Sequence, residues 1–260
     1  MHLEGTMGTL SLNTDLYVYI LGFNHNTANG ESNGITFGGF KTSATNGVDV
    51  ALCDSNYGSA NTSGLKWFNM NHRRRGSSTY GHNYGGWKGC DMRYDILGST
   101  NVQPSGYGAN ATTSNVGYDA TSTCATSPVA NTLMSCLPVD LRTVMKPMIK
   151  YTDNVGNSSN VEANITTSID YLPLLSEYEV RGSRTYANQY EQNKQARYAY
   201  YIAGNSSVKY KHSDTSPAAY WWVRSPNYSN NNNFCNVYTS GSASNYSSRN
   251  SCGVAPAFLV

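Results

Sequence analysis

The N-terminal part of the chain alternates between short runs of β-branched and aromatic residues and turns rich in Asn, Gly and Ser. The runs at 15–23, 34–40 and 48–54 have the composition of β-strands, and the run at 64–70 is a weaker candidate. The polar residues between them are typical of turns. The pattern therefore predicts a strand-rich beginning.

Helical spacing first occurs at 85–98. Apolar side chains recur there at roughly every third or fourth position, from Trp87 to Ile96, and Gly98 is a residue that stops a helix. This predicts one short helix. The next stretch, 99–131, is rich in Ser, Thr, Asn, Gly and Ala, and we expect a long surface loop there.

A second helix is expected to begin at Pro138, because proline is favoured in the first turn of a helix. Its apolar stripe would consist of Leu141, Val144, Met145 and Ile149. Pro147 would kink or end it. Residues 168–182 are predicted to form a buried strand or a strand leading into a helix. Residues 188–204 are predicted to form a helix, alone or followed by a strand, that ends at Gly204.

Near the C-terminus a polar segment lies between two strongly apolar ones, 220–223 and 253–260. Of the 25 residues in 227–251, 18 are Asn, Ser or Tyr. A disordered tail would not be bounded by such apolar anchors. We therefore expect this polar segment to be ordered.

The polar segment contains the period of a β-strand. Cys235 and Val237 alternate with polar residues, so they are predicted to face the core, while Asn236 and Tyr238 would face solvent. Gly241 fits a hairpin turn. The Asn, Ser and Tyr residues would then occupy outward or loop positions of an ordered hairpin.

The order of these elements is strands, two to three helices and a final block of strands. It predicts an α+β fold rather than repeated βαβ units. The sequence contains no repeat of fixed period and no clear linker, so we expect a single domain over 15–260. Residues 1–14 are expected to be an N-terminal extension or residues added to the natural chain, which could also be the C-terminal part of a longer protein.

Composition limits the classes of partner. Charged residues make up 13% of the chain, about half the usual share of ~25%, and the net charge is +2. A chain with so little net charge is a poor general polyanion binder, so no nucleic-acid partner is expected, and the basic run at 72–76 is better explained as a solvated loop. No apolar run reaches ~18 residues, which predicts no membrane insertion. The first residues also lack the pattern of a secretory signal.

Cysteine spacing gives no sign of a metal site. The chain has six cysteines and no CxxC pair, so neither zinc nor another metal or cofactor is expected. Most of the cysteines are expected to be reduced and partly buried.

A surface of Tyr, Ser, Asn and Gly has a known physical use. Tyr supplies a large, rigid contact area, and the small polar residues supply adaptable hydrogen bonds, as in antibody paratopes. Composition alone leaves two interpretations open: a binding surface, or a soluble loop of low charge.

Several motifs along the chain resemble one family. In order, they are "FNMNH", "GGWKGCDMRYDILG", "LLSEYEV", "WWVRSP", "FCNV", the pair Gly241 and Ala243, and "GVAPAF". Together they resemble the C-terminal domain of variable proteins of diversity-generating retroelements, found in gut bacteria and their phages, over about residues 17–260. The resemblance implies a C-type lectin-type fold, related to the formylglycine-generating enzymes, with mixed antiparallel sheets, a long displayed C-terminal hairpin and a variable region at about 221–256.

In such systems, template adenines are copied with errors into the gene. One change in an Asn codon gives Ser, Tyr and a few other residues, and two changes give residues such as Arg or Cys, which agrees with the composition of the segment. The resemblance implies a variable, ligand-binding role for Asn227, Tyr228, Ser229, Asn230, Asn232, Asn233, Asn236, Tyr238, Ser240, Ser244, Asn245, Tyr246, Ser247, Arg249, Asn250 and Ser251. It implies a scaffold role for Trp221, Trp222, Arg224, Pro226, Phe234, Cys235, Val237, Gly241, Ala243, Gly253, Pro256 and Phe258. The positions that could belong to either set are Asn231, Thr239, Ser242 and Ser248.

Three other functions compete with ligand binding. A calcium-dependent lectin needs carboxylate ligands, and no Asp or Glu follows Asp214. An enzyme like the formylglycine-generating enzymes would need reactive thiols, and Cys235 is predicted to point into the core, where thiols are usually inert. A structural virion or surface protein with a non-binding Asn/Ser-rich loop is the strongest alternative.

The favoured expectation is a non-enzymatic protein that recognises a protein or glycan on a target cell, for a phage its host receptor and for a bacterium an adhesion partner. Tyr228, Tyr238 and Tyr246 are the expected aromatic anchors. We expect a virion or bacterial cell-surface location, and a homo-oligomer such as a trimer, or a place in a larger virion or surface assembly.

Overall fold

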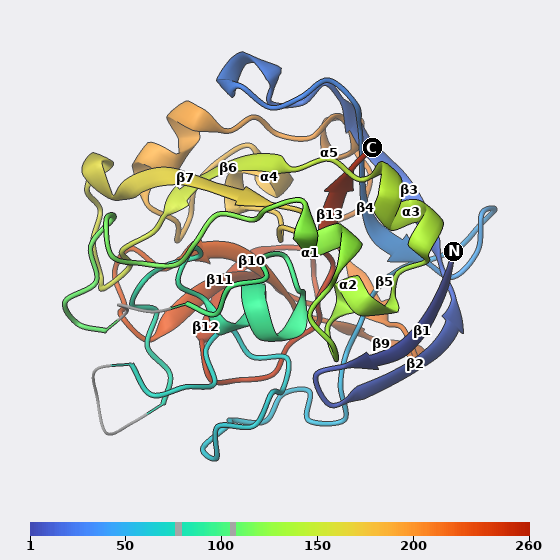
Figure 1. Ribbon diagram of the computed structural model, residues 1–260, viewed down its shortest axis with the longest axis horizontal. Coiled ribbons are helices and arrows are strands. Elements are labelled where there is room, and N and C mark those ends of the chain that lie inside the picture. The colour runs from blue at the N-terminus through green and yellow to red at the C-terminus, as the bar shows by residue number, and fades with distance from the viewer. Residues whose placement is uncertain (76–79, 105–107) are drawn as a thin grey trace.

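The computed structural model describes residues 1–75, 80–104 and 108–260, which Figure 1 shows as one folded unit. These residues form an α+β structure with mostly antiparallel strands and short helices, which confirms the predicted fold class at that level. Gly76 of the predicted basic loop and residues 105–107 of the predicted long loop lie outside the described residues. None of the helices in the described ranges is long and apolar enough to cross a membrane.

The strands are β1 His2–Met7, β2 Leu10–Asp15, β3 Tyr17–Phe23, β4 Ile35–Lys41, β5 Asp49–Ala51, β6 Met148–Asp153, β7 Ile165–Asp170, β8 Lys209–Lys211, β9 Asp214–Ala219, β10 Trp221–Pro226, β11 Asn233–Val237, β12 Ala243–Ser247 and β13 Ala257–Leu259. The α-helices are α1 Thr123–Thr126, α2 Leu133–Cys136, α3 Val139–Val144, α4 Glu177–Arg181 and α5 Ala199–Ile202. A π-helical turn spans Met92–Ile96, and 3₁₀-helices span Thr27–Asn29, Glu162–Asn164 and Gln189–Lys194.

The largest sheet within the described ranges pairs the last strand of the chain with β4, nearer its start. It has the order β13-β4-β5-β8-β9, with β3 also paired to β4, and only the β5–β8 pair in it is parallel. Strand β13 pairs with β4 so that Phe258 lies opposite Phe37, and their rings stack at 5.4 Å. The last strand therefore closes the core that β3 and β4 begin.

The N-terminal residues belong to the core, contrary to the expectation that 1–14 lie outside the domain. Strands β1 and β2 form an antiparallel hairpin, visible at the right of Figure 1. Leu3, Met7 and Leu12 of this hairpin are buried in the larger of two hydrophobic clusters. Their wide spacing among polar residues forms no clear strand pattern, so this hairpin is not predictable from the local sequence.

The strands predicted at 15–23, 34–40 and 48–54 are present as β3, β4 and β5. The weaker strand predicted at 64–70 is wrong. Phe68 and Met70 of this segment are buried while Leu65 is exposed, and side chains rather than a neighbouring strand satisfy part of its backbone. The Phe68 N–H donates to Asp54 at 3.0 Å, and the Phe68 carbonyl accepts from the Trp222 indole at 2.9 Å.

The middle of the chain is less helical than predicted. The segment 85–98 contains only the π-helical turn, and 99–131 contains α1, whose Cys124 and Ala125 are buried. Helix α3 begins directly after Pro138, as expected, and ends before Pro147. Because β6 begins at Met148, the prediction that Ile149 continues the helical stripe is wrong.

The remaining predictions hold in their coarse form. The segment 168–182 contains the end of β7 and then α4, which is the predicted passage from strand to helix. The segment 188–204 contains a 3₁₀-helix and then α5, which ends before Gly204, and no strand follows within it.

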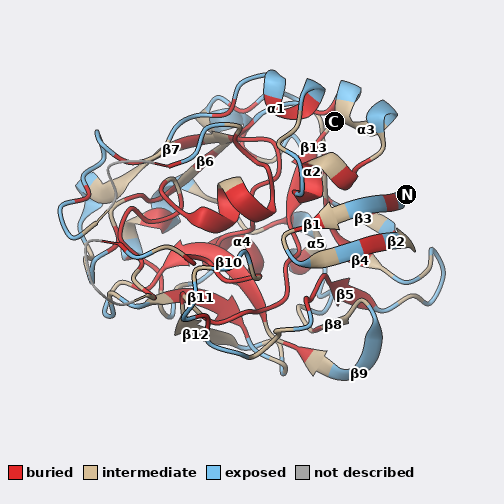
Figure 2. Ribbon diagram, turned by 60° about the horizontal axis from the view of Figure 1, so that its bottom comes forward, coloured by how far each residue is buried: buried red, intermediate tan, exposed pale blue. Residues whose placement is uncertain are grey.

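The C-terminal hairpin is present. Strands β10, β11 and β12 form an antiparallel sheet, and Figure 2 shows β10 and β11 in the red of buried residues. The turn between β11 and β12 requires glycine, because Gly241 has φ +81° and an added Cβ would lie 2.8 Å from Ser207 Oγ. Cys235 and Val237 are buried, as predicted.

Candidate functional site

The sheet β10–β11–β12 places a set of predicted binding residues on one face. In the β11–β12 ladder, Asn236 lies opposite Ser244 and Phe234 opposite Tyr246, while in the β10–β11 ladder Trp222 lies opposite Asn236. Side chains directly opposite each other share a face, and every second residue along a strand returns to it. Asn236, Ser244 and Tyr246 therefore point to the same side of the sheet.

A hollow of about 300 Å³ opens on this side of the hairpin. It is lined by Tyr220, Asn236, Tyr238, Ser244, Asn245 and Tyr246. All of these except Tyr220 were predicted as binding residues from the sequence. The structure thus brings five predicted residues, from two strands and the turn between them, around one concave surface.

Tyr220 is the centre of the aromatic part of the hollow. Its ring stacks on Tyr57 at 4.7 Å between centroids, lies parallel to Tyr238 at 6.3 Å, and meets Tyr246 edge-on at 5.5 Å. The Tyr57 hydroxyl accepts a hydrogen bond from the Tyr220 backbone N–H at 2.9 Å. Burial raises the pKa of Tyr220 to about 12, so its hydroxyl is neutral at physiological pH.

Asn236 lies deeper than the sequence predicted. It is only 4% exposed, so the prediction that its side chain faces solvent is wrong, although Tyr238 on the same face is 49% exposed. The reason is that both faces of β11 are covered, with Phe234 packed in one hydrophobic cluster and Cys235 in the other. Among the described residues, Asn236 Oδ1 has no hydrogen-bond partner.

The other predicted binding residues are distributed around the hairpin. Those exposed to solvent are Ser229, Asn230, Asn232 and Ser240, and those partly exposed outside the hollow are Tyr228, Asn233, Ser247 and Arg249. Tyr228 is not part of the hollow. Its ring packs against the Arg184 guanidinium, 4.2 Å from the ring centroid.

Three predicted binding residues are buried and bonded within the fold. Ser251 Oγ donates to Asp54 at 2.6 Å. Asn250 Nδ2 donates to the Gly58 carbonyl at 3.4 Å. Asn227 Oδ1 accepts from the Ser229 backbone N–H at 2.8 Å. These three side chains support loops rather than present a surface.

Residues outside the hairpin hold the terminal segment by its main chain. Asn83 Nδ2 donates to the carbonyls of Asn230 and Asn233, each at 2.9 Å. The carbonyl of Gly241 accepts from Arg181 at 3.1 Å and from Ser207 at 2.9 Å. Since every residue type has a main-chain carbonyl, these anchors do not depend on the side chains displayed by the segment.

The residues assigned a scaffold role in strands β10 and β11 are buried, and one belongs to a network of charges. The Arg224 guanidinium bonds Glu179 and donates to the Leu174 carbonyl at 2.8 Å. Burial raises the pKa of Glu179, but Arg224 and Lys150 more than offset this and hold it well below its ordinary value. Glu179 is therefore ionised and fixes Arg224 beneath the hairpin.

The thiols that an enzyme of the formylglycine-generating type would use are inaccessible. Cys235 and Cys252 are both free and completely buried. Burial raises the pKa of each well above its ordinary value. A thiol in this state is a poor nucleophile, because the reactive form is the thiolate.

One group of side chains has the composition of a metal site. His72, Asp91 and Asp95 are buried close together. Their carboxylates already have cationic partners, since Asp91 pairs with Arg75 at 2.6 Å and Asp95 pairs with Lys66 at 2.9 Å. Burial raises the pKa of Asp91, but Arg75, followed by His72 and Arg73, outweighs it and lowers the pKa. The cluster is an internal ion-pair network.

Sequence reasoning missed Tyr220 in the hollow and Tyr57, whose ring stacks on Tyr220. Tyr220 has the same parity as Trp222, so extending the strand pattern by one position would have placed it on the face of Asn236. Tyr57 lies in a loop far from the hairpin in sequence, and no local pattern indicates its position there.

Comparisons with known proteins gave one match. A family profile, described as a domain of unknown function, DUF6273, matches residues 129–260. No curated protein and no solved structure matches the chain. The matched range includes the whole β10–β11–β12 sheet and excludes Tyr57.

Proposed function

The chain belongs to the DUF6273 family, and we propose that it is a binding protein whose recognition surface is the tyrosine-lined hollow on the C-terminal hairpin. One observation carries this proposal. Asn236, Tyr238 and Tyr246, chosen as binding positions from the sequence, line the same hollow. Rigid tyrosines surrounded by small polar side chains are an effective recognition surface, since little side-chain freedom is lost on contact.

The partner is a protein or glycan on another cell, so the protein acts at a virion or bacterial surface in host recognition or adhesion. Tyr238 and Tyr246 serve as the aromatic anchors. Tyr228 contributes less, because Arg184 already covers its ring.

The proposal includes diversification of the hairpin by a retroelement on a C-type lectin-type scaffold. Two features support it. The scaffold positions Trp221, Phe234 and Cys235 are completely buried, while the exchangeable positions in the hollow are mostly at its surface. The anchors from Asn83 and from Arg181 reach main-chain carbonyls, so side chains can change without loss of these bonds.

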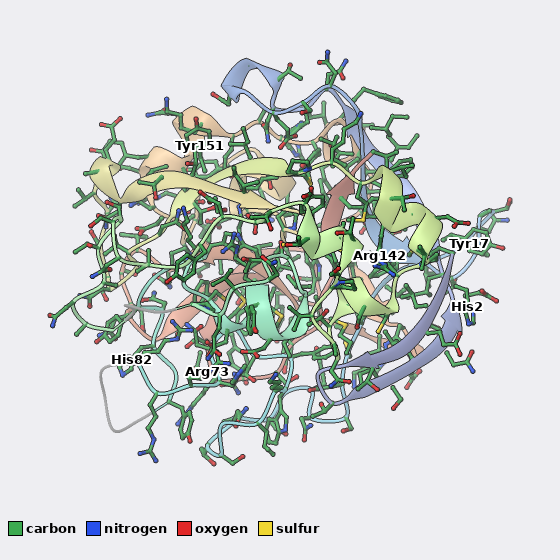
Figure 3. The ribbon with its side chains drawn as sticks, in the orientation of Figure 1. His2, Tyr17, Arg73, His82, Arg142 and Tyr151 are labelled. Atoms are coloured by element: carbon green, nitrogen blue, oxygen red, sulfur yellow. The ribbon has the colours of Figure 1, made fainter. Side chains whose placement is uncertain are left out.

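Binding is tested with fluorescently labelled protein on a panel of bacterial isolates, measured by flow cytometry. The wild type is expected to bind some isolates, and the Tyr238→Ala, Tyr246→Ala double variant to lose at least about tenfold in affinity, as for hot-spot tyrosines. Tyr17→Ala is the matched control, since Tyr17 is 45% exposed. Figures 1 and 3 place Tyr17 on β3 at the far edge from β12. Equal binding by the double variant and the wild type would refute the proposal.

Diversification is tested in the DNA that surrounds the gene. A near-copy of the coding sequence for 221–256, with adenines at the exchangeable positions and a reverse transcriptase gene nearby, is the expected result. Without such a copy, the retroelement part of the proposal is abandoned.

A further inference from the structure

The hollow is lined by two kinds of side chain. Tyr220, Tyr238 and Tyr246 supply rings, and Asn236 and Ser244 supply an amide and a hydroxyl. The side chain of Asn245, which lies opposite Cys235, points to the other face of the sheet and bonds Asn233. No Asp, Glu, Lys, Arg or His is among these lining residues. A complementary ligand therefore has an apolar face for the rings, several polar groups around its edge, and no net charge.

Asn236 supplies the strongest sign that the hollow can receive a polar group. Its amide can both donate and accept, it is 4% exposed, and its Oδ1 has no partner among the described residues. A buried polar group without a partner is unfavourable, and such groups are rare in folded proteins. Because Asn236 also lines the hollow, a ligand hydroxyl that reaches its amide from there would satisfy it.

The volume of the hollow limits the size of the ligand. About 300 Å³ is at the low end of the range for small-molecule pockets, which suits one ring and not a long chain. A pyranose has an apolar C–H face and hydroxyls around its edge. An aromatic side chain from a protein partner has a matching face but at most one polar atom, which leaves Asn236 or Ser244 without a partner.

We propose that the hollow binds a neutral pyranose, as the terminal unit of a glycan and without a metal ion, with its C–H face against the tyrosine rings and a hydroxyl bonded to Asn236. This inference rests on the proposed function and names the ligand class of the same site. The absence of a carboxylate from the lining residues is the reason that no calcium ion takes part.

In the test, single sugars are titrated into the full chain in the presence of EDTA, and binding is monitored by NMR. D-glucose, D-galactose, D-mannose and N-acetyl-D-glucosamine are the probes, and N-acetyl-L-tyrosinamide and N-acetyl-L-tryptophanamide represent protein side chains. At least one sugar is expected to bind saturably, with a dissociation constant on the order of 1 mM. Tyr238→Ala is expected to weaken it at least tenfold, and Tyr238→Phe, which keeps the ring, much less.

Asn236→Leu separates binding from folding. Leucine keeps a similar size and removes both hydrogen-bonding atoms. Because Asn236 Oδ1 has no partner to lose, Tm is expected to stay at or above that of the wild type, while sugar affinity falls at least tenfold. If Asn236→Leu binds the sugar as the wild type does, the assignment of Asn236 is overturned.

The other outcomes distinguish this inference from the proposed function. Saturable binding of an aromatic amide but of no sugar, sensitive to Tyr238→Ala, overturns the sugar assignment and leaves the proposed function in place. Binding of neither kind of probe overturns the sugar assignment, and the cell-binding assay then decides the proposed function alone. If sugar binding disappears in EDTA, the proposal that no metal ion takes part is overturned.

Discussion

The side-chain nitrogen of Asn83 lies 2.9 Å from the carbonyl oxygen of Asn230, which is 147 positions further along the chain. The same nitrogen lies 2.9 Å from the carbonyl of Asn233, and Asn83 Oδ1 accepts from the Asn157 N–H at 2.9 Å. One buried amide thus joins three parts of the chain. It fixes the loop that leads from β10 into the hairpin.

Replacement of Asn83 by Ala is expected to loosen this loop. The variant leaves the carbonyls of Asn230 and Asn233 without this donor, and the expected loss in free energy of unfolding is on the order of 1–3 kcal/mol. Urea denaturation measures it. Asn232→Ala is the control within the same loop, because Asn232 is exposed, and it should change stability by less than about 0.5 kcal/mol. Equal stability of the Asn83→Ala and Asn232→Ala variants would contradict the anchoring role.

Replacing a buried scaffold residue should reduce stability much more than replacing an exposed residue of the hollow. Trp221 is completely buried and its indole donates to the Ser207 carbonyl at 3.0 Å, so Trp221→Ala is expected to lose about 3–5 kcal/mol. Tyr238 is half exposed, and Tyr238→Ala should lose less than about 1 kcal/mol. Thermal and urea unfolding of both variants give the comparison. A large loss in Tyr238→Ala would make Tyr238 a core residue and remove it from the hollow.

Stability should also fall as pH rises through neutrality, because of Glu191. Burial raises the pKa of this carboxyl from its ordinary 4.5 to about 8. Between these values the folded chain holds a proton that the unfolded chain has released, so the stabilisation is full below about pH 4.5 and is lost as pH approaches 8. The slope from one proton is at most about 1.4 kcal/mol per pH unit.

Glu191→Gln is expected to remove this part of the slope. The free energy of unfolding of the variant, relative to that of the wild type, should therefore rise from pH 5 to pH 8 in urea titrations. Glu4→Gln, at an exposed position, provides the control and should follow the wild type. Parallel curves for Glu191→Gln and the wild type would show that the carboxyl is not held neutral in the folded chain.

The cysteines should resist alkylation until the chain unfolds. All six are free and buried, and burial raises the pKa of Cys53 and Cys90 to about 12. Iodoacetamide at pH 8 is expected to modify none of them in the native protein and all of them in urea, as counted by mass spectrometry. Rapid labelling of native Cys235 would reopen the enzyme interpretation.

The hairpin was predictable because the residues that specify its strand and turn lie close together in the sequence. Alternation at Cys235 and Val237 gives a strand, and the need for positive φ gives the turn at Gly241. The depth of Asn236 was not predictable in this way, since it depends on what covers the other side of the sheet. The position of Tyr57 depends on a loop contact with Tyr220, which no spacing in the sequence encodes.

The helix predicted through Ile149 failed for a related reason. Apolar residues near Pro147 fit a helical stripe, yet β6 pairs with β7 over its whole length, and that pairing outweighs a weak helical pattern. The N-terminal hairpin was not predicted because Leu3 and Met7 form no local strand pattern. Their burial depends on contacts with the rest of the core.

The two hydrogen bonds that clamp the Gly241 carbonyl have a thermodynamic consequence. On the proposed function, a ligand would meet a hairpin tip that folding has already immobilised, so little conformational entropy would remain to be lost when the complex forms. Affinity then depends mainly on what the displayed side chains offer, and changes of a few residues at the rim can alter it without any rearrangement of the backbone.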